Sequence, residues 1–344
     1  MAIRRVIIAG GGVAGTATAL ALSKAGIEAE VYEAHPSRGA DAGAFLTVMP
    51  NGMAGLAEIG AAEAVDAVSY PARTVTLLDT EGQRLGHRPI DAPSRSLTRA
   101  ALYRALQQLA VARGIPVHHG RRMTGATTGA DGVEVTFDDG GTVTGDVLVG
   151  ADGIHSRTRR LIDPAAPEPR YSGQHVVYGY TPGNPAGLDL DEYYMIRGGQ
   201  AFFGLTVPGG DGRTWWFARL RGPQPAAGLS PGQWRDLALS ACRDDSTPAH
   251  DLIAAAGTTV VGGDSYDIPT TPHWHGARMV LTGDAAHAAV PAAAQGASMA
   301  IEDAVALATA LSEHDDPTTA FTAYEKRRRL ETEETVAASA RMGS

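Results

Sequence analysis

Apolar positions near the amino terminus follow the order strand, helix, strand. Residues 6–9 form a short apolar run, residues 14–24 carry small and apolar side chains at helical spacing, and residues 27–32 form a second apolar run. Gly26 follows the helical segment, at a place where glycine adopts the left-handed conformation without steric cost. The pattern predicts a parallel βαβ unit at the start of the chain.

Helical spacing returns in four later segments. In one of them Leu102, Leu106 and Leu109 fall on a single face, which is typical of a helix that packs against a core. The predicted helices cover residues 53–59, 99–112, 297–311 and 318–338.

Alternating apolar and polar positions predict strands elsewhere. Residues 74–90 alternate around a Glu-Gly turn, which predicts a hairpin, and residues 132–137 and 142–149 predict two further strands. Residues 170–270 lack helical spacing over long stretches. We expect an antiparallel sheet there, interrupted by one helix near residues 231–242.

Composition narrows the class of protein. The 344 residues carry a net charge of −9, from 29 Lys and Arg against 38 Asp and Glu, so we expect no nucleic-acid partner. Cys242 is the only cysteine, which excludes an intramolecular disulfide. No apolar stretch is long enough to span a bilayer and the first residues do not resemble a signal peptide, so we expect a cytoplasmic protein. Residues 326–329 are four basic residues, which we expect to form a solvated helical face.

A glycine-rich turn between the first strand and the first helix carries the strongest chemical signal. It reads Gly10-Gly11-Gly12-Val13-Ala14-Gly15. Gly10 permits the tight turn, Gly12 lets a pyrophosphate approach the backbone, and Gly15 lets the helix pack closely on the strand. The helix start, at Val13 and Ala14, presents free N–H groups to the phosphates.

Glu33 ends the second strand, in register with this turn. A carboxylate at that place accepts hydrogen bonds from the ribose hydroxyls of a bound nucleotide. It also repels a 2′-phosphate, so we expect the adenosine of FAD or NAD rather than that of NADP.

A second motif follows an apolar run late in the chain. Gly283-Asp284 ends that run, and the chain continues through Pro291 to Gln295-Gly296. Asp284 could act as a simple helix cap, but the glycine before it and the loop after it favour a contact with the cofactor.

A third motif follows another apolar run in the middle of the chain. Asp152-Gly153 begins it, with Ser156 and Arg159 downstream. An Asp-Gly pair is also a common turn. The spacing of Ser156 and Arg159 favours the cofactor role.

These motifs, in this order, resemble the single-component FAD-dependent aromatic hydroxylases, which share the fold of para-hydroxybenzoate hydroxylase. The resemblance extends over nearly the full length. It implies an α/β fold, in which a Rossmann-like doubly wound FAD-binding domain carries an antiparallel-sheet substrate domain. We expect a discontinuous FAD-binding domain at residues 1–72, 95–165 and 276–344, and a substrate domain at residues 73–94 and 166–275.

The resemblance assigns contacts with FAD to particular residues. The glycine turn and Glu33 hold the ADP half, and Asp284 bonds the ribityl chain. Arg99 contacts FAD from the side, and Arg38 is a further expected contact. Asp152, Gly153 and Arg159 support the binding of FAD together with NADH or NADPH.

The resemblance implies that the loop from Pro291 to Gly296 passes beside the isoalloxazine ring. The sequence identifies no catalytic acid or base in this loop. Relatives usually write this loop Pro-x-x-Gly-Gln-Gly, whereas this chain has Ala294 before Gln295. If the position requires positive φ, alanine is strained there by roughly 1 kcal/mol or more. Tyr178 also departs from the family, because relatives often carry arginine before the glycine that follows.

The expected substrate residues lie in the predicted sheet. Alternate residues of a strand face one side, so we expect about half of these side chains to line a pocket. They are Tyr178, Tyr180, Tyr193, Phe203, Trp215 and Arg219. We expect His287 to order its loop rather than to act as a base, and we expect no metal site.

The resemblance implies a monooxygenase. NADH or NADPH reduces the flavin, O₂ forms the C4a-hydroperoxide, and one oxygen passes to an aromatic or polycyclic small molecule, most simply as hydroxylation. Epoxidation and Baeyer–Villiger insertion stay open. A flavin-dependent reductase or dehydrogenase, or a non-catalytic flavin-binding partner protein, is the alternative. We expect a monomer or homodimer that tailors natural products.

Overall fold

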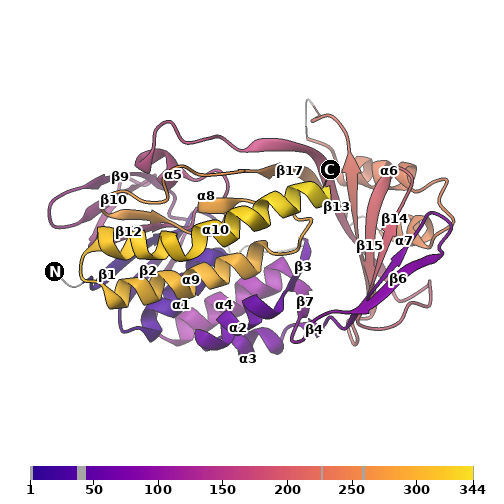
Figure 1. Ribbon diagram of the computed structural model, residues 1–344, viewed down its shortest axis with the longest axis horizontal. Coiled ribbons are helices and arrows are strands. Elements are labelled where there is room, and N and C mark those ends of the chain that lie inside the picture. The colour runs from indigo at the N-terminus through magenta and orange to yellow at the C-terminus, as the bar shows by residue number, and fades with distance from the viewer. Residues whose placement is uncertain (1–2, 37–43, 226–227, 258–259, 344) are drawn as a thin grey trace.

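The computed structural model describes residues 3–36, 44–225, 228–257 and 260–343. The molecule is elongated, with a helix-rich half that contains the amino terminus and a sheet-rich half at the opposite end (Figure 1). A parallel sheet lies in the helix-rich half, and a larger, mainly antiparallel sheet lies in the other. This arrangement confirms the predicted α/β class.

A five-stranded parallel sheet forms the centre of the helix-rich half. Its strand β1 (Arg5–Ala9) pairs with β2 (Glu28–Glu33) on one side and with β12 (Val147–Gly150) on the other. The strands β18 (Met279–Leu281) and β8 (Val117–His119) complete the sheet at its edges. Parallel strands covered on both faces are apolar at successive positions, which explains the unbroken apolar run of β1. The predicted βαβ unit is confirmed.

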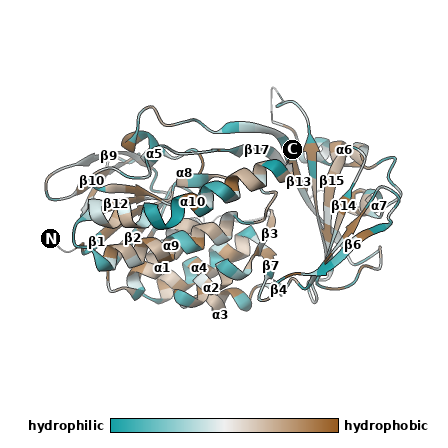
Figure 2. Cartoon of the chain, viewed as in Figure 1, coloured by the Kyte–Doolittle hydropathy of each residue, from teal (hydrophilic) through white to brown (hydrophobic). Residues whose placement is uncertain are grey.

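Helices cover one face of this sheet in two layers. The helix α1 (Val13–Lys24) contacts the strands on one side and both α4 (Arg99–Ala112) and α9 (Gly296–Glu313) on the other. The long helix α10 (Pro317–Gly343) packs outside α9. Figure 2 shows mainly hydrophilic residues along the visible face of α10, as its outer position requires. Within the described ranges, no helix has both the length and the apolar character to cross a membrane.

Two short helices add to this layer, one packed beside α9 and the other packed beside α4 and the first. A Cβ atom at Gly55 of α2 (Pro50–Glu58) would lie 2.8 Å from Cγ2 of Ile301, so α2 approaches α9 closely. The predicted helix at residues 53–59 is therefore present but begins earlier. The sequence does not predict α3 (Ala62–Asp66), because five residues are too few to reveal helical spacing.

A three-stranded antiparallel sheet covers the other face of the parallel sheet. It consists of β9 (Met123–Thr128), β10 (Val133–Phe137) and β11 (Thr142–Gly145). Apolar residues of β10 pack against those of β1 and β12.

The predicted strand at residues 142–149 is in fact two strands in different sheets. Asp146 separates them, and its carboxylate accepts hydrogen bonds from the backbone N–H groups of Arg4 and Arg5 at 2.7 and 2.8 Å. The chain crosses from one layer to the other at this residue. A continuous polar and apolar pattern cannot reveal such a crossing.

Seven strands form the large sheet. In spatial order they are β17 (Val261–Asp267), β13 (Arg170–Pro182), β16 (Arg213–Arg221), β15 (Ala201–Thr206), β14 (Glu192–Arg197), β5 (Thr74–Leu78) and β6 (Arg84–Pro89). The predicted hairpin at residues 74–90 is confirmed as β5 and β6. Only the pair β5 and β14 is parallel, because β5 reaches the sheet from a much earlier part of the chain.

Two helices cover the outer face of the large sheet. The predicted helix near residues 231–242 is confirmed as α6 (Pro231–Ala241), where Ser230 and Gln233 form a capping box. The second helix, α7 (Ala249–Ala255), is too short for its spacing to predict it.

A small sheet lies where the two halves meet. It consists of β3 (Phe45–Val48), β7 (Arg95–Thr98) and β4 (Tyr70–Pro71). Phe45 of β3 packs against Trp215 of the large sheet, with ring centroids 5.3 Å apart. Aromatic packing therefore joins the two halves.

Arg328 is buried, which makes the expectation of a solvated basic face wrong at this residue. Its side chain is 6% exposed, and its guanidinium contacts Asp303 at 2.9 Å, Glu302 at 3.1 Å and Glu331 at 2.9 Å. Two of these acids belong to α9, so the packing of α10 on α9 determines the burial. The spacing of charges within one helix does not contain that information.

We expect Arg328→Met to lower the free energy of unfolding by about 3–5 kcal/mol, because it leaves the carboxylates of Asp303 and Glu302 buried without their partner. The control Arg327→Met removes the same charge from an exposed neighbour and should change stability by less than about 0.5 kcal/mol. Urea unfolding measures both. Equal losses in the two variants would contradict a stabilising role for the buried cluster.

Candidate active site

The glycine turn brings three backbone segments into contact. Gly10 has a φ of +103°, and a Cβ atom there would lie 2.3 Å from the carbonyl oxygen of Ala151. A Cβ atom at Gly15 would lie 1.9 Å from the carbonyl oxygen of Gly10. No L side chain fits at either place, so β1, α1 and the loop after β12 meet through their backbones. Gly12 has open space around it apart from the ring of Tyr103, whose hydroxyl would be 3.7 Å from such an atom.

The start of α1 has the properties of a phosphate site. No side chain caps it, so its first-turn N–H groups and its positive dipole end stay available. The carboxylate of Glu33 lies beside it and accepts hydrogen bonds from the N–H groups of Gly11 and His35, each at 2.7 Å. The free amides suit a pyrophosphate, and the adjacent carboxylate suits a ribose. Together they fit the ADP half of FAD. Arg38 lies outside the described residues.

Arg99, Asp284 and Tyr178 come together from three elements. Arg99 begins α4, Asp284 begins α8 (Asp284–His287), and Tyr178 belongs to β13. Asp284 is accessible to solvent but is surrounded by protein on most sides. The resulting desolvation raises the pKa of its carboxyl, and the charge of Arg99 opposes that rise. The phenol of Tyr103, which accepts a 2.7 Å hydrogen bond from Nε of Arg99, contributes most to the raised pKa of Arg99, and Asp284 and Tyr178 add to it. A cation and an anion thus lie within electrostatic range of each other, a suitable arrangement for the hydroxyls and ring edge of a flavin.

Asp284 takes its position from backbone contacts around Gly283. A Cβ atom at Gly283 would lie 2.8 Å from Cβ of Ala14, so α8 begins directly above the start of α1. The N–H group of Gly283 donates a 3.0 Å hydrogen bond to Asp303 of α9. The start of α1 and Asp284 are therefore adjacent.

His287 is buried at the end of α8, where its Nε2 lies 2.5 Å from Oδ2 of Asp303. These contacts agree with the prediction that His287 orders the loop. Burial alone would lower the pKa of His287, but the charge and the hydrogen bond of Asp303 outweigh it and raise the pKa. Burial alone would raise the pKa of Asp303, but His287 and Arg328 outweigh it and lower the pKa.

Asp152 and Arg159 make contacts within the chain. The carboxylate of Asp152 accepts hydrogen bonds from Ser156, Arg157 and Thr158 at the start of α5 (Arg157–Ile162), at 2.5–3.0 Å. Arg159 is 1% exposed and donates to the carbonyl groups of Ile154 and Ala285, at 2.6 and 3.0 Å. Both side chains thus brace the loops around the site. Their predicted direct contact with a cofactor stays a prediction.

Ala294 has a φ of +54°, so the loop keeps a left-handed conformation without glycine. The strain expected for this position is therefore present. Neighbouring contacts hold the loop: Asn51 donates a 3.3 Å hydrogen bond to Gln295, and Ser339 of α10 accepts one from the N–H group of Ala293 at 3.1 Å. Pro291 and Gly296 are exposed at its two ends.

The predicted substrate residues divide between the two faces of the large sheet. Phe203 is fully buried in the core beneath α6 and α7, so the expectation that it lines a pocket is wrong. Tyr180, Tyr193 and Trp215 are buried on the opposite face, in a cluster with Phe45. Tyr178 and Arg219, on this same face, remain partly exposed.

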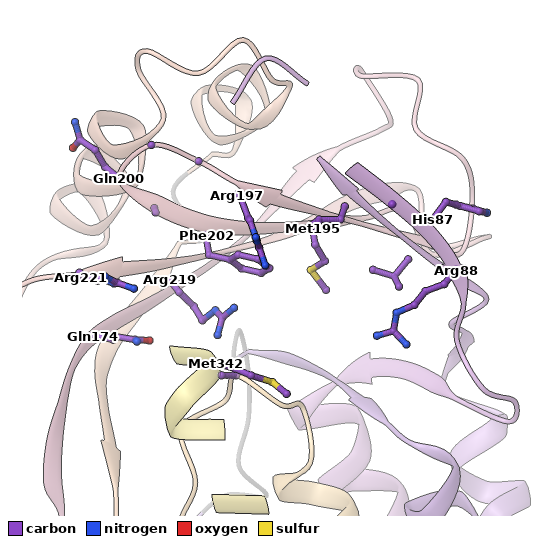
Figure 3. Close-up of a pocket in the computed structure, with 17 residues that line it drawn as sticks. His87, Arg88, Gln174, Met195, Arg197, Gln200, Phe202, Arg219, Arg221 and Met342 are labelled. Atoms are coloured by element: carbon purple, nitrogen blue, oxygen red, sulfur yellow. The ribbon is translucent and has the colours of Figure 1, made fainter. Parts of the chain in front are cut away.

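A cavity of about 1010 Å³ lies between this face and the end of α10. Figure 3 shows Arg219 and Arg88 extending into the space opposite Met342. Of its lining residues, only Arg219 is among the predicted substrate residues. The alternation of β16 places Arg221 on the same face as Arg219, and this signal could have found Arg221.

No group of three or more His, Cys, Asp or Glu side chains is arranged to hold a metal ion among the residues whose placement is described.

We expect Ala294→Gly to raise the free energy of unfolding by about 1 kcal/mol, because glycine adopts φ of +54° without the steric cost that alanine carries. Thermal unfolding of the FAD-loaded protein measures the change. The control Ala293→Gly lies one residue earlier, where φ is not positive, and should lose about 0.4–1 kcal/mol. A loss at both positions would show that Ala294 is not strained.

His287 should make stability fall as the pH rises. Because its pKa in the folded protein is raised above the ordinary 6.5, protonated His287 contributes fully below that pH, and the contribution is lost as the pH rises through the raised pKa. Asp303 acts in a separate pH range. Because its pKa is lowered, its contribution to stability is lost only in acid, below pH 3.8. The stability advantage of wild type over His287→Asn should therefore shrink between neutral and alkaline pH in thermal unfolding. The exposed His273→Asn is the control, and an advantage that grows with pH would refute the assignment.

Comparison with known proteins extends the similarity to whole chains. The FAD binding domain family matches residues 4–339. Aurachin C monooxygenase/isomerase of Stigmatella aurantiaca is 31% identical over 98% of this chain and 88% of that protein. The 3-amino-4-hydroxybenzoate 2-monooxygenase PtnB3 of Streptomyces platensis is 33% identical over 94% of this chain and 84% of that protein.

A solved structure gives the same result. HpxO of Klebsiella pneumoniae, complexed with FAD and uric acid, is 27% identical and superposes with a TM-score of 0.90 over 99% of this chain and 88% of that one. The similarity therefore includes both the flavin-facing half and the large sheet. The chain belongs to the FAD binding domain family, among the FAD-dependent monooxygenases.

Proposed function

We propose that this monooxygenase uses NADH or NADPH and O₂ to place one oxygen atom on an aromatic or polycyclic small molecule, most simply as a hydroxyl group. The observation that carries the proposal is the meeting of Arg99, Asp284 and Tyr178, which lie within electrostatic range of one another although they come from three separate elements. Arg99 and Asp284 belong to the proposed FAD-binding segments, at residues 1–72, 95–165 and 276–344, and Tyr178 belongs to the proposed substrate segments, at residues 73–94 and 166–275.

The chain contributes binding and orientation. The amides at the start of α1 hold the pyrophosphate of FAD, Glu33 holds the ribose, and Asp284 with Arg99 holds the ribityl chain and ring. Asp152 and Arg159 brace these loops. When bound, FAD supplies electron transfer and oxygen activation.

Tyr178 acts as a hydrogen-bond donor in this proposal. Desolvation raises its pKa to about 12, against the opposing charges of Arg99 and Arg219. Its phenol therefore keeps its proton at neutral pH and cannot serve as a general base. A hydroxylated or amino-substituted ring supplies its own electron density, in keeping with the aminohydroxybenzoate and uric acid named for the relatives.

Water is kept from the site by aromatic packing. Phe45, Tyr180, Tyr193 and Trp215 belong to a buried cluster against which Tyr178 packs. Exclusion of water protects a reactive oxygenating species from wasteful decay. We further propose a cytoplasmic monomer or homodimer, supplied with cellular NADH or NADPH, in the tailoring of natural products.

The test is isotopic. Purified, FAD-loaded protein is incubated under oxygen-18 gas with NADH or NADPH and a panel of phenols, aminophenols and polycyclic aromatics. We expect one compound or more to accelerate nicotinamide oxidation and to gain a single labelled oxygen atom, measured by mass spectrometry.

Other outcomes identify other functions. Oxidation of a compound without label, and equally well without O₂, would indicate a flavin-dependent dehydrogenase or reductase. Bound flavin that no compound and neither nicotinamide can reduce would indicate a non-catalytic flavin-binding partner protein. Failure to bind FAD would overturn the proposal entirely.

A further inference from the structure

The last turn of α10 forms one side of the cavity that lies against the large sheet. Met342, in this turn, lines the cavity, and Figure 3 shows its side chain across the space from Met195 and Arg219. Met195 and Phe202, from β14 and β15, line the side that belongs to the sheet. Apolar side chains therefore bound the cavity on two sides, and one of those sides is the end of a helix from the other half of the molecule.

Met342 is an exposed apolar side chain on a helix whose outer face is hydrophilic. Its exposed fraction is 63%, although α10 presents mainly hydrophilic residues on its visible face (Figure 2). An apolar group that covers such a side chain gains affinity, because apolar surface of both partners leaves water. Methionine also suits contact with a ligand, since its unbranched thioether adapts to the shape of a neighbour. An aromatic ligand in the cavity would therefore gain affinity from Met342.

Ser339, one turn before Met342, fixes the place of this side chain. Ser339 is buried, and its hydroxyl donates a 2.6 Å hydrogen bond to the carbonyl oxygen of Val290 and accepts a 3.1 Å hydrogen bond from the N–H group of Ala293. Residues three apart are neighbours on a helix, so the position of Ser339 determines that of Met342. Ala292, from the same loop, lines the cavity as well. The loop at residues 291–296 and the α10 side of the cavity are therefore held in a defined relation to each other.

The size of the cavity makes the α10 side important for the choice of ligand. Its volume of about 1010 Å³ is at the upper end of the roughly 300–1,000 Å³ that is typical of ligand pockets. A single aromatic ring fills only a small part of such a volume, whereas a fused ring system extends far enough to meet both apolar sides. The side chain of Met342 therefore limits how large a ring system can lie between α10 and the sheet.

We propose that Met342 is a specificity-determining residue, which sets the size of the aromatic ring system that the cavity accepts, and that Ser339 is its positioning residue. The inference deepens the proposed function and rests on it, because it takes this cavity as the substrate site. The large sheet supplies one side of that site, and the last turn of α10 supplies the side that limits ring size.

The test measures the binding of a series of phenols that differ in ring number: phenol, naphthol, hydroxyanthracene and hydroxypyrene. Each is titrated into oxidised, FAD-loaded protein, and the change in flavin absorbance gives its Kd. The quantity compared between variants is the ratio of the Kd of hydroxypyrene to the Kd of naphthol. Without a reductant no turnover occurs, so this ratio reports binding alone.

Two substitutions at Met342 should move the ratio in opposite directions. Met342→Ala widens the space and should lower the ratio about fivefold or more, because the larger ring system gains room and naphthol loses an apolar contact. Met342→Trp narrows the space and should raise the ratio about tenfold or more, because the bulkier side chain excludes the larger ring system. The controls Leu330→Ala and Leu330→Trp change a 70% exposed residue of the same helix that does not line the cavity, and should leave the ratio within about twofold.

Substitutions at Ser339 test its positioning role. Ser339→Ala removes both hydrogen bonds to the loop and should move the ratio toward that of Met342→Ala, because Met342 then loses its fixed position. Ser339→Thr keeps the hydroxyl and should restore most of the wild-type ratio. A Ser339→Ala protein that unfolds at a lower temperature but keeps the wild-type ratio would show a structural role alone and would overturn the positioning role.

The role of Met342 is overturned if its two variants keep the wild-type ratio, if they shift it in the same direction, or if the Leu330 variants shift it equally. It is also overturned if no phenol of any ring number binds. The isotopic test of the proposed function is separate. Oxygen-18 incorporation with an unchanged ratio would remove the role of Met342 and leave the monooxygenase standing, and a shifted ratio without any oxygen incorporation would do the reverse.

Discussion

The carboxylate of Asp303 connects the elements that carry the flavin-facing groups. It accepts the N–H group of Gly283, contacts the ring of His287 and pairs with Arg328, so α8, α9 and α10 are joined at one buried point. A protein interior accepts such an anion only where it is paired and hydrogen-bonded. The position of Asp284, the next residue after Gly283, therefore depends on a buried cluster of paired charges.

Backbone contact is the second constraint on the site. Because Gly10 and Gly15 exclude any side chain, β1 and α1 meet closely enough to present free amides to a phosphate. Gly283 sets α8 directly above this point. Tyr178 of the large sheet lies within electrostatic range of both Arg99 and Arg219. In the proposed function the two halves supply different chemistry, phosphate and ribose binding from one and aromatic and cationic contacts from the other.

Several features of the molecule were accessible from sequence because their causes are local. The βαβ unit, the helix α4 and the hairpin of β5 and β6 follow from the spacing of nearby apolar residues. The positive φ of Ala294 follows from a loop that relatives build with glycine. Phe203 was assigned to the wrong face, because the starting register of β15 decides which alternate residues point to the cavity.

By itself, the sequence determined the glycine turn with Glu33, and hence the proposed nucleotide site, because strand, turn and helix lie within one short unit whose geometry is local. Only the tertiary structure decided that Arg328 is buried, that residues 142–149 divide between two sheets, and that Arg219 shares a cavity with Arg88. Each of these depends on which surfaces pack together over long separations in the chain. The spacing of nearby residues does not predict that packing, because elements remote in the sequence form the surroundings of each side chain.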